Sequence, residues 1–321
     1  MATQAGTSES NDMTRASASK SRTRSKPGTL SIYLALMKPK IISLLLVTTA
    51  GAMMVASGGF PPLGVFFWTM LGGTLSAGGA NALNHFFDRD IDEIMYRTRQ
   101  RPIPAGWVAP RSAVIWGIFL CVVAFIIFYV FVNPLAAVLS LIGALYYIFI
   151  YTLWLKRSTP HNITIGGVAG AIPPLVGWAA VTNSLPLAAW ALFGIVFLWT
   201  PPHTWALTLV VERDYARVDV PMLPVVAGEA ETRRQILIYS WIFVIFTILL
   251  VPLRLFDWFY LIAAAVLGYF FMRNAYQVRR EGSKSAALRL YKYSLLHLAL
   301  LFAAMIADAS FPHIFSSLLG G

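Results

Sequence analysis

The stretch VIWGIFLCVVAFIIFYVFVNPLAAVLSLIGALYYIFIYTLWL, residues 114–155, contains no Lys, Arg, Asp, Glu or His. A bilayer core about 30 Å thick needs about 20 mostly apolar residues per helical span, so this stretch is long enough for two spans. The dipeptide Asn133-Pro134 near its middle is a turn signal. We therefore expect these residues to form a transmembrane helical hairpin.

Apolar runs of comparable length recur along the whole 321-residue chain. With the hairpin, they give nine predicted spans, approximately residues 40–58, 62–84, 112–132, 134–154, 163–182, 186–210, 235–253, 256–272 and 294–312. The chain is 58% hydrophobic and only 12% charged, whereas soluble domains are about 45–50% apolar and about 25% charged. This composition excludes a water-soluble globule. We predict an all-α, polytopic membrane protein with a single membrane-embedded domain over residues 30–321.

Residues 1–29 are rich in Ser, Thr, Ala and Arg and show no apolar periodicity. Such a segment cannot bury enough surface to offset its chain entropy, so we expect a disordered basic tail. An Arg-rich and Ser-rich start is also compatible with an organellar transit peptide, which the sequence leaves open.

The basic residues predict how the chain is oriented in the membrane. Of its 25 Lys and Arg residues, all but Arg254 fall in the tail or in the four loops that share its side in the nine-span arrangement. Cytoplasmic loops carry such an excess, so we expect the N-terminus in the cytoplasm and the C-terminus outside. Because topology accounts for the net charge of +11, we expect no nucleic-acid partner.

Acidic residues are scarce, and most of them gather in two loops on the predicted cytoplasmic side. Nine of the 14 Asp and Glu residues follow the second or the sixth span, at positions 88, 90, 92 and 93 and at 212, 214, 219, 229 and 231. Carboxylates at a membrane-embedded helix end are costly unless paired, solvated or bound to a metal. The two acidic loops are therefore the predicted functional site.

In the first loop, Asn84, Asp88 and Asp92 are spaced i, i+4 and i+8, so they would share one face of a continuing helix. Oxygen donors of this kind suit Mg²⁺, which takes one or two carboxylates and completes its coordination with water and phosphate oxygens. The neighbouring basic residues predicted to bind the anion are Arg97, Arg101, Lys156 and Arg157. The alternative is a solvated helix end whose ion pairs are worth about 0–1 kcal/mol each. The second acidic loop favours a metal and phosphate site.

In the second loop, Asp214 is the stronger candidate ligand, because Asp219 lies five residues later and would not align with it on an unbroken helix. Glu229 and Glu231 fit the first turn of the seventh span, where carboxylates favour the helix N-terminus. The lone acids Asp257 and Asp308 are expected at the outer interface.

His203 lies within the sixth span, next to Pro201-Pro202. A proline break there would free backbone carbonyls and could open a cavity. The histidine is then either a buried group satisfied by the broken backbone or a ligand or substrate contact. Pro173-Pro174 likewise predict a break in the fifth span.

The row Asn84-x3-Asp88-x3-Asp92, the following Arg97-Thr98-x2-Arg101-Pro102 and the second acidic loop together resemble the UbiA-type intramembrane prenyltransferases. Within that superfamily, the chain is similar to the protohaem IX farnesyltransferases, or haem O synthases, over roughly residues 30–310. The segments that carry this closer resemblance are Lys156-Arg157-x-Thr159-Pro160-His161-Asn162, Leu198-Trp199-Thr200-Pro201-Pro202-His203 and Asp214-Tyr215-x4-Val220-Pro221-Met222. The chain departs from the family pattern at His161, Thr204 and Asp219.

The resemblance implies transfer of a farnesyl group from farnesyl diphosphate to a vinyl carbon of haem B, giving haem O and diphosphate. Asp88, Asp92 and Asp214, aided by Asn84, would hold Mg²⁺, and the four basic residues named above would bind the diphosphate. His203 would contact the haem. The implied setting is a bacterial inner membrane with the site on the cytoplasmic side, and the product would pass to a haem-A synthase or to terminal oxidase assembly. The alternatives are a prenyltransferase for a quinone precursor and a membrane transporter.

Overall fold

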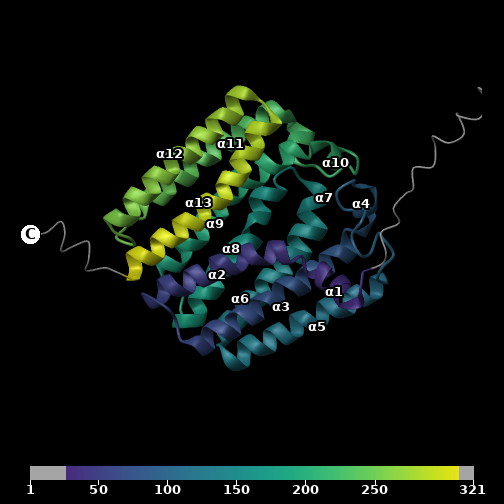
Figure 1. Ribbon diagram of the computed structural model, residues 1–321, viewed down its shortest axis with the longest axis horizontal. Helices are drawn as coiled ribbons and strands as arrows, with labels where there is room; N and C mark the ends of the chain where they lie inside the picture. The colour runs from purple at the N-terminus through teal and green to yellow at the C-terminus, as the bar shows by residue number, and fades with distance from the viewer. Residues whose placement is uncertain (1–26, 311–321) are drawn as a thin grey trace, which may run out of the picture.

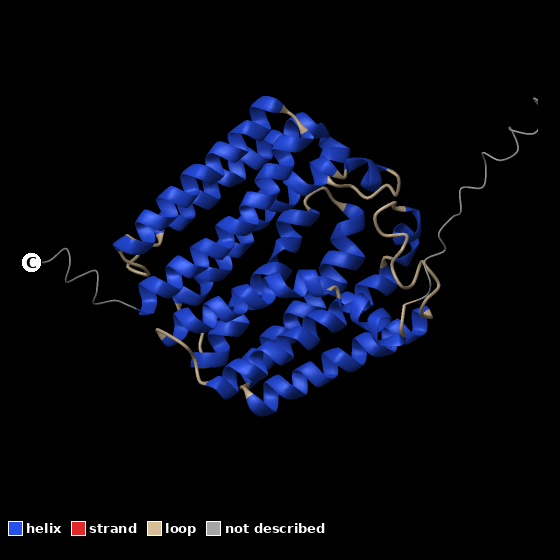
Figure 2. Cartoon of the chain, in the orientation of Figure 1, coloured by secondary structure: helices blue, strands red, loops and turns tan. Residues whose placement is uncertain are grey.

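A computed structural model describes residues 27–310, and within that range the chain is helical and contains no strand (Figures 1 and 2). The long helices are α2 (Pro39–Ser57), α3 (Leu63–Phe87), α5 (Pro110–Phe131), α8 (Asn162–Thr182), α9 (Leu187–Val210), α11 (Leu223–Leu249), α12 (Trp258–Glu281) and α13 (Lys284–Ser310). A further continuous rod consists of α6 (Pro134–Leu145), η1 (Tyr146–Leu155) and α7 (Lys156–Ser158). The short helices are α1 (Thr29–Met37), α4 (Arg89–Ile94) and α10 (Glu212–Ala216).

Eight helices in the described range are long and apolar enough to cross a membrane, the α6–η1–α7 rod among them. The remaining long helix, α9, has 24 residues and no charged side chain, although Pro201, Pro202 and His203 lie inside it. The all-α, polytopic fold class is therefore confirmed. The predicted tail, except for residues 27–29, lies outside the described residues.

The predicted hairpin is present, and Asn133 starts its second arm. The Asn133 side chain accepts a hydrogen bond from Ala136 N at 2.8 Å, which caps the N-terminus of α6. Its amide also donates to Ala179 O of α8 at 2.7 Å. One turn residue thus joins the hairpin to the neighbouring helix.

Three helices extend beyond the predicted spans at the same end of the bundle. α11 begins at residue 223 instead of 235, α13 begins at 284 instead of 294, and α12 ends at 281 instead of 272. Hydropathy marks only the part of a helix that lies in lipid. Glu, Lys and Arg are good helix formers, so they continue these helices into the polar region.

The predicted proline breaks are wrong. α8 passes through Pro173-Pro174 and α9 passes through Pro201-Pro202 without interruption, because neighbouring helices allow a packed membrane helix to tolerate proline. The irregular segment is instead η1, a ten-residue π-helix that contains neither Gly nor Pro. Such segments are rare and are frequent at functional sites.

The helices form two groups that meet along α2 and α8. α2 contacts α3 and α8 in the first group and α13 in the second, and α8 also packs on α9. Small residues allow the closest approaches: a Cβ added at Gly177 of α8 would collide with the backbone of Thr49 in α2. α2 and α8 are therefore held close together at Thr49 and Gly177.

Asp308, expected at the outer interface, is instead buried at the far end of the bundle, with 7% of its surface exposed. Its carboxylate accepts hydrogen bonds from Asp257 N at 2.8 Å and Tyr260 N at 3.2 Å. These are free N–H groups at the start of α12, so Asp308 of α13 caps a neighbouring helix.

Candidate active site

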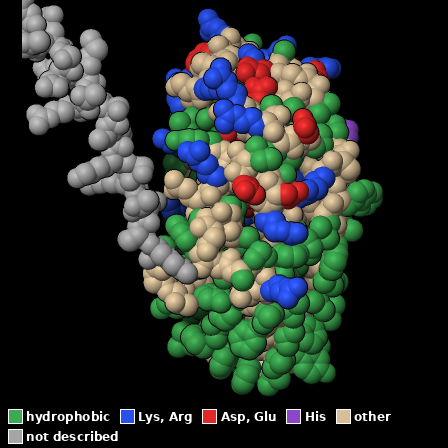
Figure 3. All heavy atoms as spheres, turned by 90° about the vertical axis from the view of Figure 1, so that its right-hand side faces the viewer, with side chains coloured by type: hydrophobic (Ala, Val, Ile, Leu, Met, Phe, Trp, Pro, Cys, Tyr) green, Lys and Arg blue, Asp and Glu red, His purple; other side chains and the backbone are tan. Residues whose placement is uncertain are grey.

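The helices α1, α4, α7 and α10 lie together at one end of the bundle, on the right in Figure 1. Lys, Arg, Asp and Glu side chains gather on this end, whereas hydrophobic side chains cover the lower part of the same view (Figure 3). Arg97 of the first acidic loop contacts Asp214 of the second, 117 residues later in the chain. The two acidic loops therefore reach the same end of the molecule.

The predicted row of Asn84, Asp88 and Asp92 is present, although one uninterrupted α-helix does not carry it. α3 ends at Phe87, and Asp88 adopts φ −91° and ψ 4° between α3 and α4. Hydrogen bonds from Asp88 N to Asn84 O (2.9 Å) and from Asp92 N to Asp88 O (2.8 Å) preserve the i+4 spacing across the join. The three side chains are buried, with exposed fractions of 3%, 1% and 1%.

Each aspartate of this loop has a basic partner. Lys156 Nζ lies 2.6 Å from Asp88 Oδ2, and Arg101 Nη1 donates to both oxygens of Asp92 at 2.7 and 2.6 Å. Arg157 instead forms two 2.7 Å hydrogen bonds with the exposed Asp90, and these lower the pKa of Asp90 to about 2. Thus Lys156 and Arg101 face the buried row, while Arg157 lies at its rim, 3.9 Å from Asp88 Oδ1.

Lys38, which the sequence marks only as one of the basic residues preceding the first span, also belongs to the site. Lys38 occupies the elbow between α1 and α2 in a left-handed conformation, φ 58°. Its Nζ donates to Asn84 Oδ1 at 2.6 Å. Burial, and then the positive charge of Arg101, lower the pKa of Lys38 to about 7. The Lys-Pro pair at the membrane boundary was the available signal, since proline starts α2 and fixes the elbow.

Asn84 connects the row to the π-helix. Its Nδ2 donates to Asp88 Oδ2 at 2.8 Å and to Thr152 Oγ1 at 3.0 Å. Thr152 Oγ1 in turn donates to the carbonyl of Tyr147 at 2.8 Å. In η1 this residue pair is separated by five positions, the repeat of π-helical hydrogen bonding. The irregular segment therefore supplies an acceptor directly to the row.

The second loop touches the first through Asp214. Arg97 N donates to Asp214 Oδ2 at 3.4 Å, and Arg217 lies 3.8 Å from Asp214 Oδ1. Asp219 is exposed and has φ 51°. α10 ends at Ala216, so Asp219 does not share a helix with Asp214.

A further contact fixes the position of this loop. The buried Asn162, at the start of α8, donates to Pro221 O at 3.4 Å.

Burial and the neighbouring Glu229 raise the pKa of Glu212. Glu229 directly follows the kink of α11 at Gly228, where φ is 80°. Glu229 therefore begins the straight part of that helix, as predicted.

Within residues 27–310, no three His, Cys, Asp or Glu side chains converge closely enough to hold a metal ion by themselves. One buried oxygen is nevertheless suited to a cation: Asp88 Oδ1 has no hydrogen-bond partner in the described structure. A cationic group, Arg157 Nη2, lies 3.9 Å from this oxygen. A carboxylate oxygen buried without a hydrogen bond is costly, and a hard cation is its natural partner. The donor set thus fits an ion that draws its remaining ligands from water and phosphate oxygens, as Mg²⁺ does.

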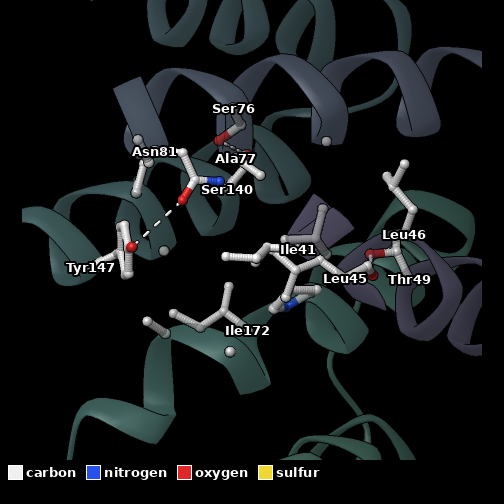
Figure 4. A pocket seen from close by; sticks show the side chains of 18 residues that line it. Ile41, Leu45, Leu46, Thr49, Ser76, Ala77, Asn81, Ser140, Tyr147 and Ile172 are labelled. Atoms are coloured by element: carbon white, nitrogen blue, oxygen red, sulfur yellow. Dashed lines mark hydrogen bonds between the residues drawn. The ribbon is translucent and has the colours of Figure 1, made fainter. Parts of the chain in front are cut away.

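An apolar cavity of about 200 Å³ lies between α2, α3, α6, η1 and α8 (Figure 4). Asn81 and Tyr147 line it, and Asn81 is one helical turn from Asn84. Small residues, such as Gly143 and Gly170, form much of its wall. The cavity can accept a slender apolar chain whose polar end reaches the acidic row.

His203 lies apart from this row, between α9 and α13. Its ring stacks between Trp199 and Tyr291, with centroid distances of 4.0 and 4.7 Å. Its Nδ1 lies 2.7 Å from Ser294 Oγ, whose hydroxyl donates to Tyr291 O at 2.7 Å. When the Ser294 hydroxyl donates to Tyr291 O, Nδ1 carries the proton and the Nε2 lone pair is available. The side chain is held by Ser294 and not by a broken helix backbone.

The sequence model of the UbiA prenyltransferase family matches residues 44–304. The chain belongs to this family. The match covers every long helix at least in part, and the resemblance inferred from the acidic motifs is confirmed.

Several relatives carry the name protoheme IX farnesyltransferase. The protein of Chloroflexus aurantiacus is 56% identical over 89% of this chain and 49% of its own length, and that of Roseiflexus sp. is 54% identical over 88% and 53%. The chain therefore spans about half the length of these two relatives. The protein of Gloeobacter violaceus is 49% identical over 88% of this chain and 93% of its own length.

Solved structures share the fold. A digeranylgeranylglyceryl phosphate synthase has a TM-score of 0.73 at 20% identity and covers 88% of this chain and 98% of its own. A UbiA homolog from Archaeoglobus fulgidus, bound to DMAPP and Mg²⁺, has a TM-score of 0.61 at 15% identity and covers 85% and 98%. At these identities the likeness concerns the fold alone.

Proposed function

We propose that this protein transfers the farnesyl group of farnesyl diphosphate to a vinyl group of haem B and forms haem O. The observation that carries the proposal is the buried row of Asn84, Asp88 and Asp92, held by basic side chains and adjoining an apolar cavity. The names of the relatives support the choice of farnesyl and haem as substrates.

In the proposed reaction the C1–O bond of farnesyl diphosphate breaks, and both electrons leave with the diphosphate. The vinyl π electrons of haem B then form the new C–C bond to C1. The cation left beside the macrocycle takes the oxygen of a water molecule, which releases a proton. The balance needs only farnesyl diphosphate, haem B and water.

The chain's own residues act on the leaving group. Lys156 is buried at the row, Arg101 is half-buried beside it, and Arg157 lies at its rim. Lys38 joins them from the α1–α2 elbow. The exposed Arg97, whose backbone N contacts Asp214, is proposed to reach the diphosphate as well. Their fixed positive charges would stabilise the negative charge that grows on the diphosphate.

Asp88, through its free oxygen, would hold Mg²⁺ together with Asp92 and Asp214, and Asn84 would assist. A bound Mg²⁺ would supply a Lewis acid for the diphosphate oxygens. The solved Archaeoglobus homolog of the same fold is bound to DMAPP and Mg²⁺, which supports Mg²⁺ as the ion. Because no three acids converge within residues 27–310, the two loops are proposed to share the ion once diphosphate is bound.

His203 is the proposed haem contact. Its Nε2 lone pair could ligate the haem iron, and stacking between Trp199 and Tyr291 fixes the plane of the ring. The proposed haem contact therefore lies beside α13, and the vinyl edge of the macrocycle would extend from there to C1 of the farnesyl group.

The acidic end is proposed to face the cytoplasm of a bacterial inner membrane, because the basic loops gather there. Farnesyl diphosphate would then arrive from the water phase, and haem B and the product would move through the bilayer. The product would pass to a haem-A synthase or to terminal oxidase assembly.

The test uses the purified protein in detergent with haem B, farnesyl diphosphate and Mg²⁺. Mass spectrometry should find haem O, with one diphosphate released per product. Product on a quinone precursor in direct competition, and none on haem B, would favour the alternative prenyltransferase. Solute uptake that persists in Asp88→Ala would favour a transporter.

A further inference from the structure

Tyr147 lies where the apolar cavity meets the polar site. Its ring lines the cavity, and its hydroxyl donates to Asn81 Oδ1 at 3.5 Å (Figure 4). Asn81 is anchored in turn, since its amide donates to Met37 O at 3.0 Å. The ring of Tyr151 stacks on the ring of Tyr147, with centroids 5.6 Å apart and an interplanar angle of 19°. These contacts fix the orientation of the Tyr147 ring.

The backbone of the same residue reaches the acidic row. The Tyr147 carbonyl accepts from Thr152 Oγ1 at 2.8 Å, and Thr152 Oγ1 accepts from Asn84 Nδ2 at 3.0 Å. Thus one residue of the π-helix faces the cavity with its ring and supports Asn84 with its carbonyl. A regular α-helix would not provide this five-residue contact.

The position of Tyr147 suggests a role in the reaction, and this role rests on the proposed function. If the row holds the diphosphate and the cavity holds the isoprenoid chain, then C1, which joins them, lies at the junction beside Tyr147. Positive charge develops on the allylic carbons as the C1–O bond breaks and both electrons leave with the diphosphate. An aromatic face attracts a cation, most strongly where water is excluded.

We propose that Tyr147 is a catalytic residue whose ring stabilises the farnesyl cation until the vinyl group of haem B attacks it. The basic groups at the row, Lys38, Arg101 and Lys156, cannot do this, because they repel a cation. The cavity wall beside Tyr147 otherwise consists mainly of aliphatic or small residues, such as Ala80 and Ala144. Among the residues that line the cavity, Tyr147 is the aromatic one.

The test compares Tyr147→Phe, which keeps the ring, with Tyr147→Leu, which removes it. We expect Tyr147→Phe to keep kcat within about 3-fold. Tyr147→Leu should lower kcat about 30-fold, corresponding to about 2 kcal/mol at 1.36 kcal/mol per factor of ten, with KM for farnesyl diphosphate nearly unchanged. Tyr146→Leu is the matched control, because Tyr146 precedes it in η1 but does not line the cavity; its hydroxyl donates to Ile165 O.

Fluorinated phenylalanines at position 147 provide a second measurement, because they weaken the π face while nearly keeping the shape of the ring. kcat should fall progressively with each added fluorine. A kcat independent of fluorination, or equal losses in Tyr147→Phe and Tyr147→Leu, would overturn the role of the ring. Failure of the wild type to make haem O would instead overturn the proposed function, so the two failures are distinguishable.

Discussion

The buried pair of Asp88 and Lys156 allows stability and activity to be separated. Their exposed fractions are 1% and 9%, and Lys156 Nζ lies 2.6 Å from Asp88 Oδ2. Asp88→Asn keeps the shape but leaves the ammonium without its carboxylate. Lys156→Met removes the cation that is hydrogen-bonded to the carboxylate and leaves only Arg157, at 3.9 Å. Breaking a buried pair on one side costs about 3–5 kcal/mol. The double variant carries no unpaired charge, so it should be more stable than either single variant.

Reversible unfolding in detergent measures this cycle, and diphosphate release measures activity on the same samples. We expect a coupling free energy of about 3 kcal/mol between the two substitutions. Activity should fall by at least about 1,000-fold in all three variants, because the double variant restores neither the ion's ligand nor the diphosphate's partner. Additive stability losses would refute the pairing, and restored activity in the double variant would refute the catalytic assignment.

Three other outcomes follow from particular contacts. Asp308→Ala should lower the free energy of unfolding by about 1–3 kcal/mol, because two N–H groups of α12 lose their acceptor, while activity per folded molecule stays unchanged; inactive but equally stable protein would contradict this. A Leu side chain at position 170 has room for its Cβ and would fill the cavity. Gly170→Leu should therefore raise KM for farnesyl diphosphate roughly 100- to 1,000-fold, at about 0.8 kcal/mol per displaced CH₂. The control, Gly64→Leu, also has open space around its Cβ and should leave KM unchanged. Because Lys38 has a pKa of about 7 and diphosphate favours its charged form, KM should rise as pH increases above 7; the same rise in Lys38→Arg would exclude Lys38 as its source.

The sequence was sufficient to predict the helical membrane fold and the composition of the acidic row. Apolar runs report directly on lipid burial, and the i+4 spacing of Asn84, Asp88 and Asp92 is a local property. It survives the end of α3 because backbone hydrogen bonds continue through the join. The hairpin at Asn133 was predictable for the same reason, since turn chemistry is encoded in adjacent residues.

Features that depend on contacts between distant segments could not be predicted. Lys38 reaches Asn84 across 46 residues, and Asp308 caps a helix that begins about 50 residues earlier. The π-helix has no local marker, and continuous helices at Pro173 and Pro201 depend on neighbours that sequence periodicity does not reveal. Whether Asp214 shares an ion with Asp88 also depends on a ligand, so that assignment stays a prediction.

The central claim is that a divalent ion carrying diphosphate joins the two acidic loops. The most direct measurement is the affinity for Mn²⁺, used in place of Mg²⁺ and followed by electron paramagnetic resonance, with farnesyl thiodiphosphate present. We expect at least about tenfold weaker binding in both Asp88→Asn and Asp214→Asn, and wild-type binding in Asp90→Asn. Wild-type affinity in Asp214→Asn would show that only the first loop holds the ion and would refute a shared site.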